Sequence, residues 1–164
     1  MIPLVRLAFG ILLLSACISN ASASTCLTTL PTYPPFTPPA PQNTASVGHS
    51  FWYGNEALWT LLPVNGTWRG LGHYNADTAG YRQKIFWWSA GSDWLAEPKP
   101  KLILTARRLD GDAPALATAN ASSAYNSDIG SAMLLGVDIP IHGCWEITGH
   151  YGGHTLSFVV SVEP

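Results

Sequence analysis

The sequence predicts an all-β fold, an antiparallel β-sandwich of about seven strands. The first observation behind this prediction is composition: the chain is 47% hydrophobic and only 11% charged, and its seven Trp, fifteen Gly and thirteen Pro suit short strands joined by tight turns. The second is that alternating apolar runs recur along the chain, separated by turn signals such as Asn65-Gly66. No segment requires a helix longer than one turn.

The first residues are typical of an export signal. Residues 7–14 form an apolar run behind Arg6 that is too short to span a bilayer as a helix of the mature protein. Residues 14–17, Leu-Ser-Ala-Cys, match at each position the end of a bacterial lipoprotein signal. We therefore expect a signal peptide over residues 1–16 and a lipid anchor on Cys17, with enough acyl chains for stable membrane attachment. The alternative is cleavage after Ala23, which gives a soluble secreted protein beginning at Ser24.

The expected anchor at Cys17 determines how the other two cysteines are interpreted. If Cys17 carries lipid, Cys26 and Cys144 remain as an even pair in an oxidising compartment, so they are predicted to form a disulfide. The predicted location is extracytoplasmic, attached to a bacterial membrane.

The charge of the chain argues against nucleic acid as a partner. The chain has eight basic and ten acidic residues, and no positive strip forms, so a nucleic-acid partner has no electrostatic support. The only adjacent basic pair, Arg107 and Arg108, points to opposite faces of an expected strand.

The mature chain is expected to contain one domain, residues 46–164, after a tether and proline-rich segment over residues 17–45. Six prolines lie between residues 31 and 41, which favours an extended polyproline II conformation. With Cys26 bonded to Cys144, this segment should lie along the domain surface, with Tyr33 and Phe36 packed against it.

Four strands are predicted upstream of the C-terminal hairpin, at residues 57–63, 84–90, 101–109 and 132–140. Alternation within the last two predicts which side chains face the core. These core positions are Leu102, Leu104 and Ala106, then Met133, Leu135, Val137 and Ile139.

A hairpin is predicted at the C-terminus, with two alternating runs around Gly152-Gly153. Placing Tyr151 opposite His154 sets Ile147 against Phe158 on a continuous apolar face. Cys144 then points away from the core, so its disulfide would hold the proline-rich segment over the outer face of this hairpin.

The motif GCWEITG at residues 143–149 resembles the end of an uncharacterised family of secreted bacterial proteins, many of them lipoproteins, with a C-terminal GCWE(I/V)TG motif. The resemblance extends to a Cys followed by a Pro-rich segment near the mature start and to ARRLDG at residues 106–111. It implies an immunoglobulin-like domain that ends with this hairpin. It implies no activity, because none is known for the family.

The run at residues 84–90 is apolar on both faces, with Ile85 and Trp87 on one and Phe86 and Trp88 on the other. One face belongs to the core. The second is either covered by another segment, such as the proline-rich one, or open to an envelope protein or a cell-wall glycan, since flat aromatic patches bind sugar rings. The residues of this possible binding surface are Trp52, Tyr53, Trp59, Trp87, Trp88 and Trp94.

Catalytic and metal sites are not expected. His150 and His154 have the spacing that binds zinc on a helix, but the hairpin register sends them to opposite faces. Asp110 and Asp112 flank a glycine as turn residues do, and Glu146 lies on an outward strand face, which does not favour an acid/base pair. No nucleophile motif is present in residues 48–50, and no cofactor is implied. The sequence thus predicts a binding or structural role, with a carbohydrate-binding module as the alternative.

Overall fold

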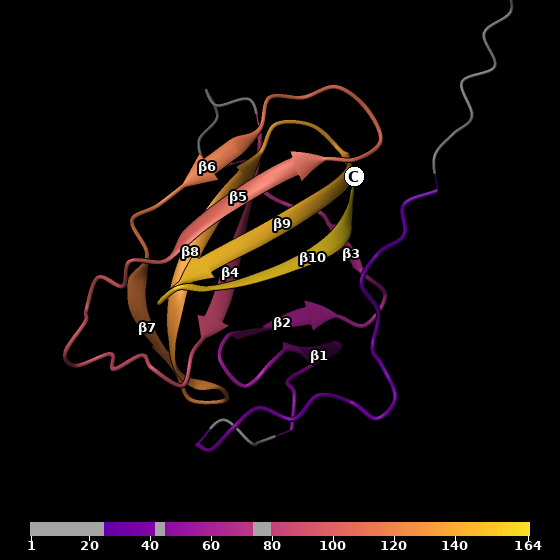
Figure 1. The fold of residues 1–164 in the computed structure, drawn as a ribbon. Coiled ribbons are helices and arrows are strands. Elements are labelled where there is room, and N and C mark those ends of the chain that lie inside the picture. The colour runs from indigo at the N-terminus through magenta and orange to yellow at the C-terminus, as the bar shows by residue number, and fades with distance from the viewer. Residues whose placement is uncertain (1–24, 42–44, 74–79) are drawn as a thin grey trace, which may run out of the picture.

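Two five-stranded β-sheets pack face to face (Figure 1). The computed structural model describes residues 25–41, 45–73 and 80–164. The strands of the first sheet are, in spatial order, β1 (Ser50–Gly54), β2 (Trp59–Pro63), β4 (Tyr81–Trp88), β8 (Gly130–Ile139) and β7 (Ser122–Asn126). Those of the second are β3 (Thr67–Arg69), β10 (His154–Glu163), β9 (Gly143–Tyr151), β5 (Ile103–Arg108) and β6 (Leu116–Thr118). The predicted all-β sandwich is confirmed.

The sandwich differs from the prediction in strand number and in one pairing. The strands that the sequence did not predict are β1, β3, β6 and β7. They have three to five residues each, which is too short for an alternating pattern to be recognised. Strand β3 also runs parallel to β10, whereas the other paired strands are antiparallel. The backbone N–H of Ser161 continues this pairing by donating to the carbonyl of Gly66 at 2.9 Å.

The main core lies between the sheets, and its predicted faces are confirmed. Leu104 of β5 and Ile139 of β8 are fully buried, and the other positions expected to face inward, including Leu102 just before β5, are buried as well. The indole of Trp87 lies directly on the backbone of β9. A Cβ atom at Gly149 would stand 2.5 Å from Cη2 of Trp87, so glycine leaves the space that this ring occupies.

The C-terminal hairpin has the predicted register. His154 pairs with Tyr151, and Phe158 pairs with Ile147. Tyr151, Ile147 and Phe158 belong to the core, whereas His154, next to the turn, is exposed. Gly152 and Gly153 have φ angles of 56° and 80°, the positive values that a two-residue turn requires and that glycine adopts without steric cost.

The second face of β4 is also covered. It carries a smaller apolar group, the second cluster, on the side of the first sheet away from the main core. Its buried members are Trp52, Trp59, Trp88, Ile129 and Ala132, with Phe36, Val47, Leu61 and Phe86 packed around them. Phe36 comes from the proline-rich segment, so the covered interpretation of this face is the one that the structure supports.

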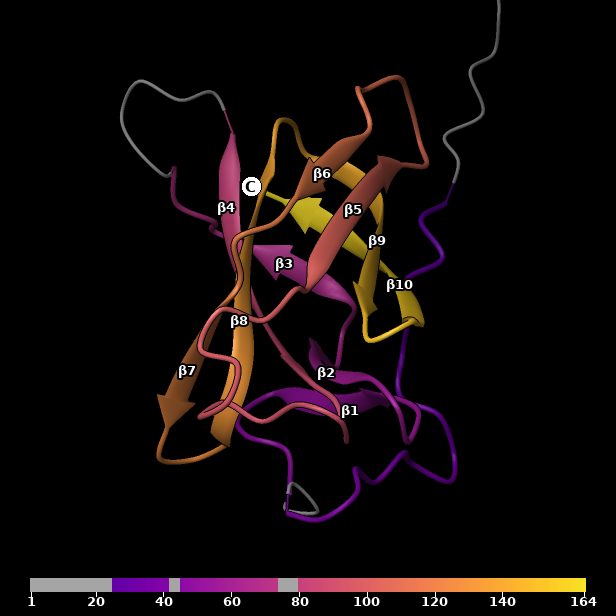
Figure 2. The ribbon, with the colours of Figure 1, turned by 60° about the vertical axis from the view of Figure 1, so that its left-hand side comes forward.

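The segment over residues 26–41 runs along the edge of β10 and then beside β1 and β2, as both views show (Figures 1 and 2). Cys26 and Cys144 form the predicted disulfide, with 5.4 Å between their Cα atoms. The N–H of Thr29 donates to the carbonyl of Val159 at 2.8 Å, and the N–H of Val159 donates to Thr29 Oγ1 at 2.9 Å. The segment therefore covers Cys144, which is buried, and reaches the edge of β10 at Thr29, so that its proline-rich part does not lie over the outer face of the hairpin.

One expected contact of this segment is wrong. Tyr33 is 97% exposed, although it was expected to pack down with Phe36. Phe36 is partly buried against the second cluster, and Pro38 is buried. The reason is that the chain is attached at Thr29 and again at Phe36, and Tyr33 falls between these two attachments.

Candidate binding site

The aromatic residues proposed as a surface do not form a flat exposed patch. Trp52, Trp59, Trp87 and Trp88 are each 7% exposed or less, because both faces of β4 are covered. Tyr53 is partly buried, its hydroxyl donates to the carbonyl of Ser157 at 2.9 Å, and burial raises its pKa. Trp94 alone among the six is well exposed, at 51%.

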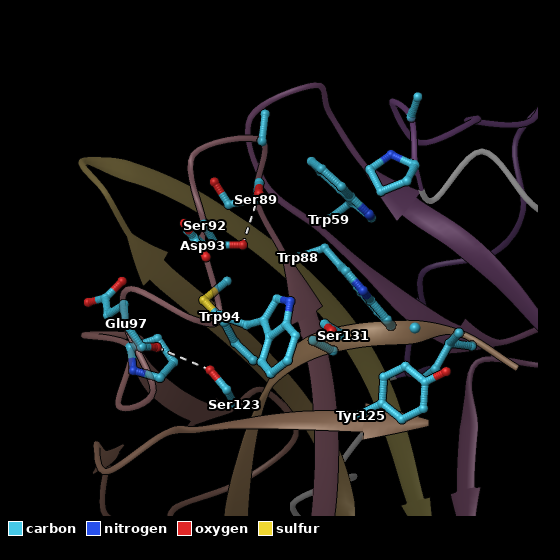
Figure 3. Close-up of a pocket in the computed structure, with 18 of the residues that line it drawn as sticks. Trp59, Trp88, Ser89, Ser92, Asp93, Trp94, Glu97, Ser123, Tyr125 and Ser131 are labelled. Carbon is cyan, nitrogen blue, oxygen red and sulfur yellow. Dashed lines mark hydrogen bonds between the residues drawn. The ribbon is translucent and has the colours of Figure 1, made fainter. Parts of the chain in front are cut away.

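Four aromatic side chains meet around one cavity of about 510 Å³, which we call the aromatic cavity. They are Trp59, Trp88, Trp94 and Tyr125, and Figure 3 shows the last three around a common space with Ser131 between Trp94 and Tyr125. Trp94 and Tyr125, which is 75% exposed, form the rim. Trp59 and Trp88 form the base. This volume is within the range of small-molecule sites.

Strand pairing brings these residues together. Trp59 at the start of β2 is the register partner of Trp88 at the end of β4, so their side chains stand side by side on one face of the sheet. Tyr125 of β7 is likewise paired with Ser131 of β8. Because β2, β4, β8 and β7 are successive neighbours, the cavity lies across one end of the first sheet.

A hydrogen-bonded turn after β4 fixes the backbone around Trp94. The N–H and Oγ of Ser92 both donate to the carbonyl of Ser89, at 3.1 and 3.0 Å. Asp93 Oδ1 then accepts the N–H of Leu95 at 2.9 Å, as aspartate does at the start of a turn. An exposed tryptophan is therefore held on an ordered backbone.

Glu97 attaches this turn to both sheets. Its carbonyl accepts the hydroxyl of Ser123 on β7 at 3.1 Å, and its Oε2 accepts the hydroxyl of Tyr151 on β9 at 2.5 Å. Its Oε1 accepts the N–H of Lys101 at 3.1 Å. Burial, followed by the hydrogen bond and charge of Glu97, raises the pKa of Tyr151 to about 12. Both carboxylate oxygens of Glu97 thus have structural partners.

The polar lining of the cavity is acidic and rich in hydroxyl groups. Asp93, Glu97 and Asp128 line it together with five serines, and no Lys, Arg or His is found among the described residues of its wall. The indole N–H groups of Trp59 and Trp88 are buried without a hydrogen-bond partner in the described part of the chain. Such groups are uncommon in native proteins.

Several polar atoms at the rim have no partner within the described residues. These atoms are the Trp94 Nε1–H, the Tyr125 hydroxyl, the Ser131 hydroxyl and the second carboxylate oxygen of Asp93. The cavity therefore combines apolar ring surface with both hydrogen-bond donors and acceptors. Chemically, this arrangement can hold a small ligand that has an apolar face and polar edges.

The acidic residues considered for catalysis are in ion pairs or turns. Glu146 pairs with Arg107 at 2.9 Å, and Asp110 pairs with Arg108 at 2.8 Å, so neither is free to act as a base. Asp112 is exposed and lies in the connection that follows β5.

A second hollow of about 490 Å³, which shares Ser89 and Ala90 with the aromatic cavity, is lined by Glu56 and His154. Both side chains are exposed, and they are not hydrogen bonded to each other. This geometry does not assemble an acid/base pair.

The histidines are dispersed. His150 is bonded to Thr155 across the hairpin at 3.1 Å, while His154 lies on the other face, as expected from the register. His73 contacts the carbonyl of Gly80 at 2.7 Å, and His142 stacks on Tyr81 with ring centroids 4.2 Å apart. Among residues 25–41, 45–73 and 80–164, no group of three His, Cys, Asp or Glu side chains could hold a metal ion.

Sequence reasoning missed Tyr125 and Ser131. Tyr125 is a single aromatic residue in a stretch of small polar residues, and Ser131 precedes a predicted strand, so neither belongs to a recognisable pattern. Their pairing across β7 and β8 is what places them at the cavity.

Within the described part of the chain, no helix is long and apolar enough to cross a membrane. Comparison with known proteins finds no matching family model, no matching curated protein and no matching solved structure.

Proposed function

We propose that this protein is an extracytoplasmic, non-catalytic binding domain, lipid-anchored to a bacterial membrane at Cys17, and that it binds its ligand at the aromatic cavity. The observation that carries the binding role is the convergence of Trp94 and Tyr125 on a fixed rim above buried rings. Exposed aromatic side chains gathered around a cavity are a feature of interaction sites.

The anchor is supported by the pairing of the other two cysteines. Cys26 and Cys144 are bonded to each other, which is typical of an oxidising compartment and leaves Cys17 as the remaining thiol of the sequence. Cys17, like the signal peptide over residues 1–16, lies outside the described residues. Nine residue steps separate Cys17 from Cys26, a span of at most ~30 Å, so the domain would stay close to its membrane.

A non-catalytic role is supported by the composition of the cavity. Its hydroxyl groups belong to serines and to Tyr125, and no histidine is among the described residues that line it to activate them. An envelope protein and a cell-wall glycan are the two partners that this location would supply.

Site-resolved crosslinking in intact cells tests the proposal. A photoreactive amino acid replaces Tyr125 at the rim, and a matched probe replaces Ile103, which is 45% exposed on the opposite sheet. We expect adducts, detected as a mass shift whether the partner is protein or glycan, from position 125 and not from position 103. Equal labelling from both positions, or none from position 125, would contradict a ligand site at the cavity.

A further inference from the structure

The aromatic cavity has the chemistry of a site for one ligand class. Trp94 presents an indole of which about half remains accessible, and the rings of Trp88 and Tyr125 stand nearby around the same space (Figure 3). An indole face is a large apolar plane, and it attracts the C–H groups of a flat, partly apolar ring. A pyranose ring has such a C–H face and carries hydroxyl groups around its edge.

The free polar atoms favour hydroxyl groups as binding partners. The N–H of Trp94 can only donate, the free carboxylate oxygen of Asp93 can only accept, and the hydroxyls of Tyr125 and Ser131 can do both. A ligand that satisfies all four must itself donate and accept. Sugar hydroxyls do both, whereas a quaternary ammonium group can do neither.

The charge of the cavity wall narrows the class of ligand further. The described residues of the wall include three carboxylates and no basic side chain, so an anionic ligand would be repelled and would find no counter-charge. Phosphorylated or uronic acid-containing polymers are therefore disfavoured. Neutral sugars meet no such repulsion, and a carboxylate accepts their hydroxyl hydrogens in strong, charge-assisted bonds.

The rim is also preorganised. Ser89, Ser92 and Asp93 fix the turn that carries Trp94, and Glu97 ties this turn to β7 and β9. Little backbone order would be lost or gained when a ligand arrives, which favours affinity in a small, partly open site.

We propose that the aromatic cavity binds a neutral saccharide, with one sugar ring packed against Trp94 and its hydroxyl groups bonded to the free polar atoms of the rim. This inference rests on the proposed binding function and names the ligand class for the same site.

The test is titration of the full chain, purified in detergent, with a panel of neutral oligosaccharides. The panel is cellohexaose, maltohexaose and triacetylchitotriose, and the readouts are calorimetry and tryptophan fluorescence. Hexagalacturonate and tetramethylammonium chloride serve as anionic and cationic probes. We expect saturable binding of at least one neutral member, and no binding of hexagalacturonate.

Three variants locate the site. Trp94→Ala should weaken saccharide binding at least about tenfold, because it removes the ring plane against which the sugar packs, and tryptophan is enriched among the residues that dominate binding energy. Trp94→Phe keeps an aromatic plane and should recover most of that loss. Leu95→Ala changes a neighbour that is 73% exposed and is not part of the cavity wall, so it should leave affinity within about twofold. Circular dichroism checks that each variant is folded.

The results separate the two proposals. Failure of all three neutral saccharides to bind, binding that Trp94→Ala does not alter, or binding of tetramethylammonium alone would overturn the saccharide inference. If position 125 still forms specific crosslinks in cells, those same results would leave the proposed binding function standing. Absence of specific crosslinks would overturn the proposed function itself.

Discussion

Removing the Cys26–Cys144 disulfide should cost a large part of the stability of the domain. The bridge closes a loop with a sequence separation of 118 residues. In the chain-entropy model, a cross-link of this length stabilises the folded state by about 5 kcal/mol, and loss of native disulfides typically costs about 2–5 kcal/mol. The hydrogen bonds between Thr29 and Val159 and the packing of Phe36 against the second cluster remain, so the segment keeps two attachments.

The perturbation is the double substitution Cys26→Ala and Cys144→Ala. Alanine is chosen because Cys144 is only 3% exposed, and a serine there would bury a hydroxyl group. Urea unfolding of the detergent-purified chain, followed by tryptophan fluorescence, should show a free energy of unfolding lower by about 2–5 kcal/mol. Reduction of the parent chain should produce a similar loss.

Cys17→Ala is the matched control, because it removes a thiol that the proposal assigns to lipid. Its intact mass should lack the acyl chains, while its free energy of unfolding stays within about 0.5 kcal/mol of the parent. If the double alanine variant is as stable as the parent, or if Cys17→Ala destabilises the domain equally, the reasoning on the three cysteines is refuted.

Two further predictions concern packing and pH. Gly149→Ala would place a Cβ 2.5 Å from Cη2 of Trp87 and should lower the free energy of unfolding by about 1–3 kcal/mol, whereas Gly136→Ala, whose Cβ would have no neighbour nearer than 3.6 Å, should change it by less than about 0.5 kcal/mol. Equal urea midpoints for these two strand variants would contradict the close contact. The pKa of Tyr151 is raised to about 12 from an ordinary value of 10, so between pH 10 and 12 the unfolded phenol loses its proton while the folded one keeps it, and stability falls as pH rises. Tyr151→Phe should therefore show a smaller drop in Tm across this interval, and profiles of equal slope would disprove the link.

The parts of the fold that the sequence predicts well are those governed by local alternation. The hairpin register follows from the alternating runs on either side of Gly152-Gly153, and β8 shows its core face in Met133 and Val137. Short strands such as β3 escape prediction, because three residues cannot display a period and their place depends on pairing with a distant strand.

The site could be predicted only in part, for a related reason. Trp94 is recognisable as a candidate, but whether Trp59 and Trp88 are exposed depends on what covers the second face of β4. Tyr33 shows the same limit for a residue that was expected to be packed and is exposed. Its proline-rich context indicates an extended chain but does not indicate which side chains of that chain reach the domain.

The attachment of Cys26 to β9 also decides how the molecule bears mechanical load. Tension applied through the N-terminal end of the chain passes at Cys26 into Cys144, a residue whose strand is hydrogen bonded to β10 and to β5 on its two sides. The pull thus enters the centre of the second sheet, and strands β1 to β8, which lie within the covalent loop, are not in line between the N-terminal end and β9. A domain tethered in this way can bear a pull on the chain before Cys26 without being unfolded strand by strand from β1.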